Sequence, residues 1–226
     1  MTGARERVVL PTAPRVWWGA IAALAALVVV VLGILYGGAG GPGAVDQRVG
    51  AAVDGAGTSW RHVALATDFL GEPGGAAMLV GAAAAAALVL RWPRAALFVV
   101  AGPGLSVVAT KLLKPLVGRT IHDGHLSYPS GHTAFLTAFA LAVALLVTGR
   151  LRLGGAAGPS LVLATATAAG AAMGWAQVTL GAHYPTDALG GWCTALAVTP
   201  ATAWLVDRTA DRPAGRTSGA PQPERR

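Results

Sequence analysis

Two histidine-containing segments are the parts of this sequence best suited to chemistry. His132 follows Pro129-Ser130-Gly131 at the start of a long apolar run, and His183 stands before another apolar run much later in the chain. A Pro-Ser-Gly turn that leads into a helix presents unpaired backbone N–H groups and the positive end of the helix dipole, which both favour a phosphate. Asp187 lies four residues after His183, so one helical turn would bring its carboxylate to the imidazole. The spacing predicts a phosphate site assembled from separate helices.

The chemistry that suits this set is phosphoryl transfer. A histidine can act as the nucleophile and carry the phosphoryl group, while an acid on its other ring nitrogen fixes the tautomer. A second histidine can protonate the leaving oxygen. Lys114 and Arg119 precede the first segment and would place positive charge around the phosphate oxygens. A lone histidine at a membrane edge is usually an interfacial residue, but two in such contexts favour a catalytic role.

The composition indicates a membrane protein. The chain has 226 residues, of which 54% are hydrophobic and 12% charged, and its mean hydropathy is +0.57. Apolar runs of spanning length recur, so we expect an all-α, polytopic membrane protein built as a six-transmembrane-helix bundle. The runs are Val16–Tyr36, Gly74–Leu90, Ala95–Leu113, Thr133–Thr148, Pro159–Leu180 and Ala188–Val206.

The basic residues predict the topology. A formal charge of +7 could indicate nucleic-acid binding, but the basic residues form short clusters between apolar runs. We therefore expect the bilayer, and no nucleic acid, as the partner. Most of the basic residues lie in the N-terminus, in the loops after the second and fourth runs, and in the tail. The positive-inside rule then predicts a multi-pass cell-membrane protein with cytoplasmic termini and an extracytoplasmic active site.

The rest of the chain follows from this plan. We expect a cytoplasmic segment over 1–15, a membrane domain over 16–206 and a disordered cytoplasmic tail over 207–226. A cleaved signal peptide is the alternative for the first run, but about 20 apolar residues exceed a usual signal core. Residues 44–71 mix polar and apolar residues at a spacing that predicts one or two short helices lying in the interface. Gly102-Pro103-Gly104 predicts a kink.

Two motifs resemble those of a known family. Tyr128–Thr133 and Gly181–Asp187 resemble the second and third motifs of the type 2 phosphatidic acid phosphatase superfamily, which are membrane lipid phosphatases and pyrophosphatases. The resemblance extends over about Lys111–Gly191 and includes the six-helix plan.

The resemblance implies a role for each motif residue. His183 would be the nucleophile, Asp187 its orienting acid and His132 the general acid. The phosphate-binding groups would come from Lys114, Ser130 and Gly131. The family implies no metal and no other cofactor.

The sequence departs from the family where two arginines are expected. The first motif has a lysine, six residues and then Arg-Pro, but counting from Lys114 reaches Ile121-His122. The third motif has Ser-Arg before the nucleophile, and here Ala176-Gln177 fill those positions. We therefore expect Arg119 to swing in as the main phosphate ligand, with His122 or His125 as alternatives. Gln177 would add an uncharged hydrogen bond.

These residues predict an enzyme that hydrolyses a lipid phosphate or diphosphate through a phosphohistidine. An isoprenoid carrier diphosphate fits an outward-facing site, and phosphatidic acid or phosphatidylglycerol phosphate fits nearly as well. One alternative is a phosphotransferase that gives the phosphoryl group to another acceptor. Another is a non-catalytic lipid-phosphate-binding protein, which the missing arginines favour. A transporter is a weaker alternative, because the charges lie at the ends of the apolar runs and not at mid-membrane.

Overall fold

The computed structural model describes residues 15–54, 60–122 and 124–210. The expectations for 1–15 and 207–226 lie almost entirely outside these ranges.

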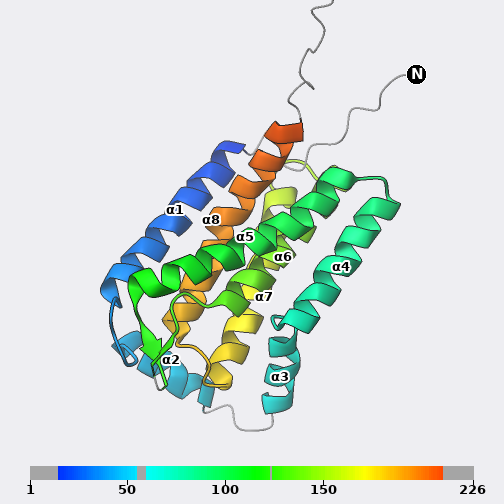
Figure 1. Ribbon diagram of the computed structural model, residues 1–226. Coiled ribbons are helices and arrows are strands. Elements are labelled where there is room, and N and C mark those ends of the chain that lie inside the picture. Colours follow the sequence, from blue (N-terminus) through cyan, green and yellow to red (C-terminus); the bar gives the residue numbers. More distant parts are fainter. Residues whose placement is uncertain (1–14, 55–59, 123, 211–226) are drawn as a thin grey trace, which may run out of the picture.

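The described residues form helices and one short hairpin (Figure 1). In chain order the elements are α1 (Arg15–Leu35), α2 (Ala44–Asp54), α3 (Arg61–Phe69), α4 (Pro73–Val89), α5 (Pro93–Val117), β1 (Thr120–Ile121), β2 (His125–Leu126), α6 (Gly131–Arg150), α7 (Ala157–Thr179) and α8 (Pro185–Ala210). The strands β1 and β2 pair antiparallel, with Thr120 opposite Leu126. The hairpin therefore occupies the polar connection between α5 and α6.

The predicted membrane bundle is confirmed. Five helices, α1, α5, α6, α7 and α8, are long and apolar enough to cross a membrane. The pair α3 and α4, bent by 57° at a short break, supplies the sixth crossing if it is counted as one broken span. α5 forms a single helix through Pro103, and α8 continues past the predicted end at Val206 to Ala210. The short helices expected over 44–71 are α2 and α3.

α6 and α8 form the centre of the bundle. In each of them 61% of the apolar window is buried, compared with 17% in α1. α6 packs against α5, α7 and α8, and its Leu141 and Leu145 lie in the core with Phe98. Large apolar side chains such as Val89 and Leu116 face outward and are more than three-quarters exposed. An outward apolar surface of this kind suits contact with lipid, because lipid tails are themselves apolar.

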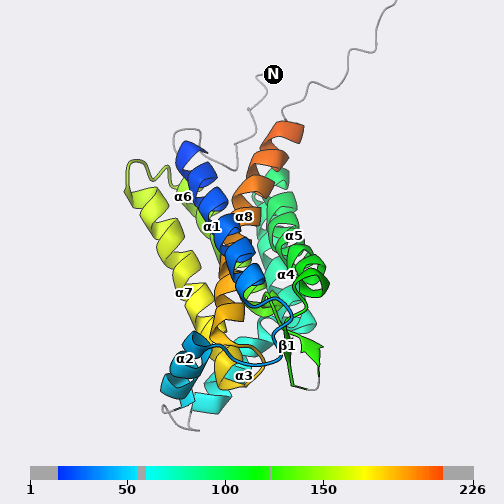
Figure 2. The same cartoon turned by 90° about the vertical axis from the view of Figure 1, so that its left-hand side faces the viewer.

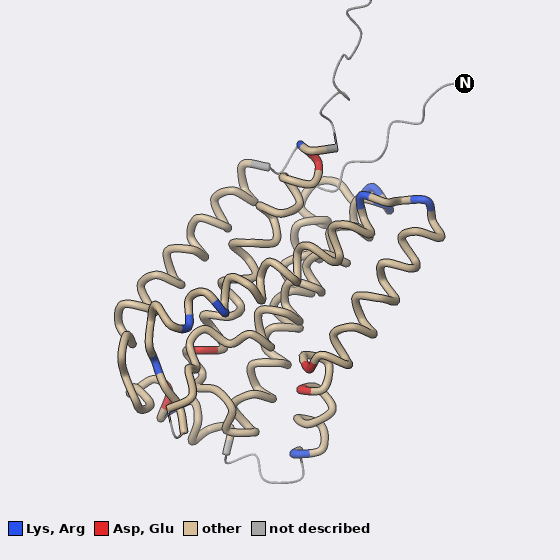
Figure 3. The backbone as a smooth tube through the Cα atoms, viewed as in Figure 1, with Lys and Arg blue, Asp and Glu red and all other residues tan. Residues whose placement is uncertain are grey.

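One end of the bundle carries the polar connections. In Figures 1 and 2, α2, α3 and the hairpin lie together at the end opposite the start of α1 and the end of α8. Arg91 lies in the turn between α4 and α5, and Arg150 ends α6. Figure 3 shows one group of basic residues at the turns that follow α4 and α6, and other basic residues at the opposite end, on the last part of α5 and at the start of α3. The two motif segments lie at the same end of the bundle as α2 and α3 (Figures 1 and 2).

Two glycines let α8 approach the first motif segment. A Cβ on Gly191 would lie 2.3 Å from the carbonyl oxygen of Ser130, and one on Gly190 would lie 2.4 Å from a ring carbon of Tyr128. A backbone oxygen cannot move aside as a flexible side chain can, so the Gly191 position excludes any larger residue without local displacement. The close approach brings the start of α8 against the start of α6.

Candidate active site

The first motif segment forms the N-terminus of α6. Ser130 is the N-cap: its Oγ accepts hydrogen bonds from the backbone N–H of Thr133 (3.3 Å) and from Thr133 Oγ1 (3.1 Å). The preceding Tyr128–Pro129 bond is cis. Ser130 is fully buried. Because the first N–H groups of an α-helix have no intrahelical partner, those of Gly131 and His132 are available to an anion.

The second motif segment connects α7 to α8. Gly181 has φ +71°, a left-handed conformation that ends α7 and turns the chain. The backbone N–H of His183 donates to the carbonyl oxygen of Gln177 (3.3 Å). His183 Nδ1 lies 3.6 Å from Asp187 Oδ2, and the His183 side chain is only 9% exposed. The predicted i, i+4 pairing of these two residues is therefore present in the structure.

Burial sets the charge of His183. It lowers the pKa of the imidazole, the nearby charges of Lys114 and His132 lower this pKa further, and Asp187 acts in the opposite direction. The net effect is a pKa below the ordinary value, so the ring is neutral at pH 7. A neutral imidazole whose Nδ1 faces a carboxylate keeps Nε2 available as a nucleophile.

The structure brings the two motif segments into contact. The backbone N–H of Ser130 donates to the carbonyl oxygen of Asp187 (2.9 Å). A second connection passes through Asp68, which accepts a short hydrogen bond from the Gln177 amide and lies 3.7 Å from His132 Nε2. His132 and His183 therefore belong to one site, built by the ends of α3, α6, α7 and α8.

Arg119 does not lie where a phosphate ligand was expected. It is fully buried, and Nη1 donates to Asp187 Oδ1 (2.7 Å) and to Thr186 Oγ1 (2.6 Å). Nη2 donates to Asp46 Oδ2 (2.5 Å). Two carboxylates thus share the one guanidinium: Nη1 donates to Asp187 and Thr186, Nη2 donates to Asp46, and the buried Nε has no hydrogen-bond partner. The expectation of a swinging phosphate ligand does not match this arrangement, because leaving it would strand two buried acids.

The other expected phosphate ligands are placed as follows. Lys114 Nζ donates to the carbonyl oxygen of Leu126 (2.8 Å), which leaves two of its protons available. Gln177 is buried, and its amide is engaged with Asp68. His122 and His125 are exposed in the hairpin, and His122 Nε2 lies 2.7 Å from the carbonyl oxygen of Gly181. His122 therefore contacts the loop before His183, whereas His125 Nδ1 lies 3.3 Å from the carbonyl oxygen of His122 within the hairpin.

Asp68 and Glu72 are site residues that sequence reasoning did not identify. Glu72 Oε1 lies 3.6 Å from His132 Nε2, and Nε2 is buried without a hydrogen-bond partner. The ligand atoms of Asp68, Glu72 and His132 all lie within 4.8 Å of one another, so this group could hold a metal ion. The chain has only 10 acidic residues. Two acids at i, i+4 spacing beside a break between helices were the available signal.

Gly71 leaves room for the His132 ring. A Cβ at this position would lie 2.4 Å from His132 Cδ2. The turn between α3 and α4 therefore packs directly on the imidazole, and the same turn supplies Glu72.

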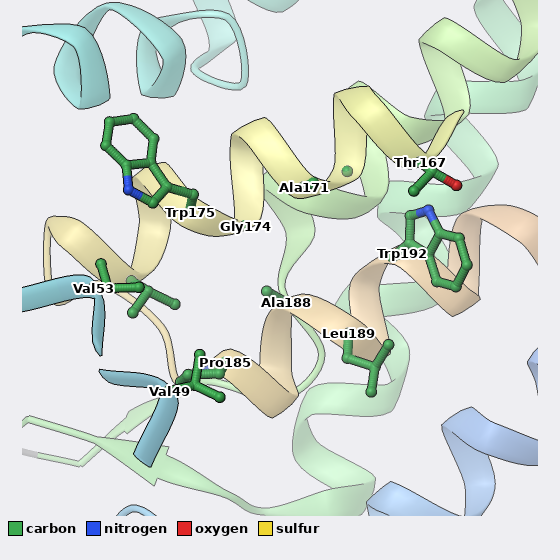
Figure 4. Close-up of a pocket in the computed structure, with 12 residues that line it drawn as sticks. Val49, Val53, Thr167, Ala171, Gly174, Trp175, Pro185, Ala188, Leu189 and Trp192 are labelled. Carbon is green, nitrogen blue, oxygen red and sulfur yellow. The ribbon is translucent and has the colours of Figure 1, made fainter. Parts of the chain in front are cut away.

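An apolar pocket lies on α7 and α8 beside the second motif segment (Figure 4). Its volume is about 360 Å³, and Val49 of α2, Trp175 of α7 and Trp192 of α8 contribute to its wall. Pro185 and Ala188, which flank Asp187 in sequence, line it too. Among the residues that the structure describes, no ionisable side chain lines this pocket, so the described wall is unsuited to a phosphate group and suited to a hydrocarbon.

Comparisons with known proteins identify the family and the fold. A family model described as the PAP2 superfamily matches residues 95–211. Among solved structures, the chain is similar to one described as the first transmembrane PAP2 type phosphatidylglycerolphosphate phosphatase from Bacillus subtilis. That match has a TM-score of 0.64 and 20% sequence identity, and it covers 87% of this chain and 98% of the other. No curated protein gave a significant match.

Proposed function

The chain belongs to the PAP2 superfamily, and we propose that it removes a phosphate group from a membrane lipid phosphate or diphosphate. The observation that carries this proposal is the pairing of His183 with Asp187 against the N-terminus of α6. His183 Nδ1 lies 3.6 Å from Asp187 Oδ2, and the backbone of Asp187 accepts a hydrogen bond from Ser130. An oriented, neutral imidazole beside free helix N–H groups is suited to attack on phosphorus.

The proposed reaction has two steps. In the first, Nε2 of His183 attacks phosphorus, the bond from phosphorus to the leaving oxygen breaks, and His132 gives that oxygen a proton. Asp187 stabilises the positive charge that develops on the imidazole. In the second, His132 takes a proton from water, the water oxygen bonds to phosphorus, and the P–N bond breaks. Inorganic phosphate leaves and both histidines return to their starting state.

Phosphate binding in this chain depends on few cations. We propose that Lys114 and the first-turn N–H group of Gly131 hold the phosphate oxygens, with Ser130 fixing the turn as its N-cap. Arg119 is engaged elsewhere, and the acids Asp68 and Glu72 lie beside His132. In this proposal His132 supplies the proton for the leaving oxygen.

The location of the site supports a lipid substrate. The site lies at one end of a membrane bundle, where lipid headgroups are found, and the apolar pocket beside Pro185 is suited to a hydrocarbon chain. Isoprenoid carrier diphosphate and phosphatidic acid are the substrates we propose first. Phosphatidylglycerol phosphate, which the sequence also suggested, is the third, and the similar solved structure is described as a phosphatase of that lipid.

We also propose that the site faces away from the cytoplasm. Arg91 and Arg94 lie at the turn between α4 and α5, and Arg150 and Arg152 lie at the turn between α6 and α7. Both turns are at the end opposite the site (Figure 3). The positive-inside rule places that end in the cytoplasm.

Phosphate release from a lipid panel tests the proposed function. Purified wild-type protein should release inorganic phosphate from at least one of the three lipids, and His183→Ala should not. His62→Gln, which changes an exposed histidine on α3, is the control and should retain wild-type activity. Equal release by wild type and His183→Ala would reject hydrolysis by this site and favour a non-catalytic lipid-binding protein.

The proposed mechanism needs no metal, because the imidazoles supply the nucleophile and the proton. Asp68, Glu72 and His132 nevertheless offer three ligand atoms close together, so the point requires its own test. Activity should persist in EDTA. Loss of activity in EDTA that Mg²⁺ restores would contradict a metal-free mechanism.

Phosphoryl transfer to a second acceptor is the other candidate function. The burial of His183, whose side chain is only 9% exposed, favours it, because limited access of water lengthens the life of a phosphohistidine. A product assay with and without added alcohols or lipid acceptors distinguishes the two. Formation of a phosphorylated acceptor at the expense of inorganic phosphate would indicate transfer.

A further inference from the structure

We infer that Arg119 and Asp46 are positioning residues for Asp187, the acid that orients His183. This inference rests on the proposed function and assigns these residues a part in the same site. Neither residue needs to touch the substrate in this role. Both act through the carboxylate of Asp187.

The burial of the three charged groups is the first observation. Arg119 and Asp187 are 0% exposed and Asp46 is 2% exposed. A buried carboxylate without a cation is costly to desolvate, and two of them beside each other would also repel. Arg119 is the cation within hydrogen-bond distance of both acids, at 2.7 Å from Asp187 and 2.5 Å from Asp46. Asp187 therefore depends on Arg119 to lie charged at this place.

The division of the Asp187 oxygens is the second observation. Oδ1 accepts from Arg119 Nη1 (2.7 Å), while Oδ2 accepts from the backbone N–H of Tyr184 (3.0 Å) and lies 3.6 Å from His183 Nδ1. The guanidinium thus holds one oxygen and turns the other toward the imidazole. A carboxylate fixed in this way selects the ring tautomer that leaves Nε2 free.

Asp46 and Thr186 fix the arginine in turn. Asp46 Oδ1 accepts from the backbone N–H (2.9 Å) and the hydroxyl (2.8 Å) of Thr186, and Asp46 Oδ2 accepts from Arg119 Nη2. The same Thr186 hydroxyl accepts from Arg119 Nη1 (2.6 Å). Burial raises the pKa of Asp46, but the hydrogen bonds from Thr186, Gly43 and Arg119 outweigh it and leave the pKa below its ordinary value. Asp46 is therefore charged at neutral pH.

Two aromatic rings restrict the guanidinium further. The Arg119 guanidinium carbon lies 4.3 Å from the ring centroid of Tyr36 and 4.5 Å from that of Tyr184. Cation–π contacts at these distances add to the ion pairs in a buried setting. Tyr184 directly follows His183, so this contact also ties the nucleophile's own loop to the arginine. Two ion pairs and two aromatic rings therefore hold the Arg119 guanidinium in place.

Variants with separate predictions for binding and for turnover test this inference. Arg119→Lys can reach only one of the two acids, and Asp46→Asn removes the charge that holds the arginine. Both should lower kcat by about 10–100-fold, the range for partners that orient catalytic groups. KM and the inhibition constant of orthovanadate, a soluble phosphate mimic, should stay near wild-type values. Arg48→Gln, an exposed change on the same helix α2, is the matched control and should not alter kcat.

Thr186→Val provides a milder variant if a charge change prevents folding. It removes the hydroxyl that links Arg119 and Asp46 without leaving a charge unpaired. A lower kcat with an unchanged KM is expected here too. Thermal unfolding of each purified variant, and the kcat of its folded fraction, separates a loss of fold from a loss of orientation.

Several outcomes would overturn the inference. If Arg119→Lys raises KM and the orthovanadate inhibition constant while Asp46→Asn changes neither constant nor kcat, Arg119 is a phosphate ligand. If the variants melt at lower temperature but keep the wild-type kcat, the cluster only stabilises the fold. Wild-type activity no greater than that of His183→Ala would instead reject the proposed function, and this inference with it. An active wild type with unchanged variants rejects the inference alone.

Discussion

The two imidazoles proposed as catalytic, those of His183 and His132, both face carboxylates, but their surroundings are built differently. Asp187, beside His183, is fully buried and held by Arg119 and by the backbone N–H of Tyr184. Asp68 and Glu72, beside His132, are 22% and 51% exposed and lie 3.7 and 3.6 Å from its Nε2. A nucleophile must approach phosphorus along one direction, so its orienting acid benefits from being fixed. A proton donor can tolerate a looser partner.

Activity should be more sensitive to mutation of Asp187, the buried acid beside His183, than to mutation of the acids beside His132. Asp187→Asn keeps the shape of the side chain but removes the charge that orients His183 and balances Arg119. We expect kcat to fall by about 10⁴-fold, as when the orienting acid of a catalytic triad is neutralised. Phosphate release at saturating lipid measures it, with thermal unfolding as the check on folding. A loss below tenfold in a folded variant would mean that the acid does not orient the nucleophile.

The role of His132 as a proton donor can be separated from any role in binding. His132→Gln should lower the rate of enzyme phosphorylation by about 10²–10⁴-fold for a lipid phosphate, whose alkoxide leaving group needs a proton. An aryl phosphate with an acidic phenol as its leaving group needs little protonation, so its loss should be much smaller. Single-turnover assays of this first step with both substrates measure the contrast, because the second step uses His132 whichever substrate is supplied. Equal losses for the two substrates would contradict the assignment of His132 as the general acid.

Asp68 and Glu72, the partly exposed acids beside His132, should tolerate substitution better than Asp187 does. Asp68→Asn and Glu72→Gln should each lower kcat by less than about tenfold, because partly exposed ion pairs are worth about 0–1 kcal/mol. The same phosphate-release assay measures both variants beside Asp187→Asn. A loss of kcat as large as that of Asp187→Asn would show that Asp68 or Glu72 is essential for activity. Restoration by Mg²⁺ would then indicate that they hold a cation.

The pH dependence of the reaction should reflect the buried nucleophile. The pKa of His183 is lowered by burial, so the ring stays neutral to a lower pH than a free imidazole does. The acid limb of kcat/KM should therefore lie below about pH 6.5, the ordinary imidazole value. Rates between pH 4 and 8 measure the limb, and the titration of the free lipid phosphate is recorded separately. An acid limb of kcat/KM that belongs to His183 and lies above pH 6.5 would contradict the inference that burial lowers the pKa of this histidine.

The fold was predictable because its signals are local. Each apolar run is long enough to identify a span by itself, and the predicted run at Gly74–Leu90 agrees with α4 at Pro73–Val89. The hairpin of β1 and β2 was not predicted, because each strand has two residues and no alternation can be read in so short a segment. The i, i+4 relation of His183 and Asp187 was also local, and the structure contains it.

The partners of the site residues were less predictable. Arg119 pairs with Asp46, which is 73 residues away in sequence, and with Asp187, which is 68 residues away. Neither spacing leaves a pattern, so an arginine near a phosphate motif was read as a phosphate ligand. Asp68 meets Gln177 across 109 residues for the same reason. Motif residues can be found from sequence, whereas the groups that hold them depend on how distant helices pack.

Trapping of the phosphorylated enzyme tests the central claim most directly. Wild-type protein is mixed with a lipid phosphate carrying labelled phosphorus, quenched with alkali within one turnover and digested, and the labelled peptide is identified by mass spectrometry. The label should be on His183, should decay as inorganic phosphate appears, and should be absent from His183→Ala. Phosphate release by the wild type with no label on His183, or with the label on another residue, would contradict the account.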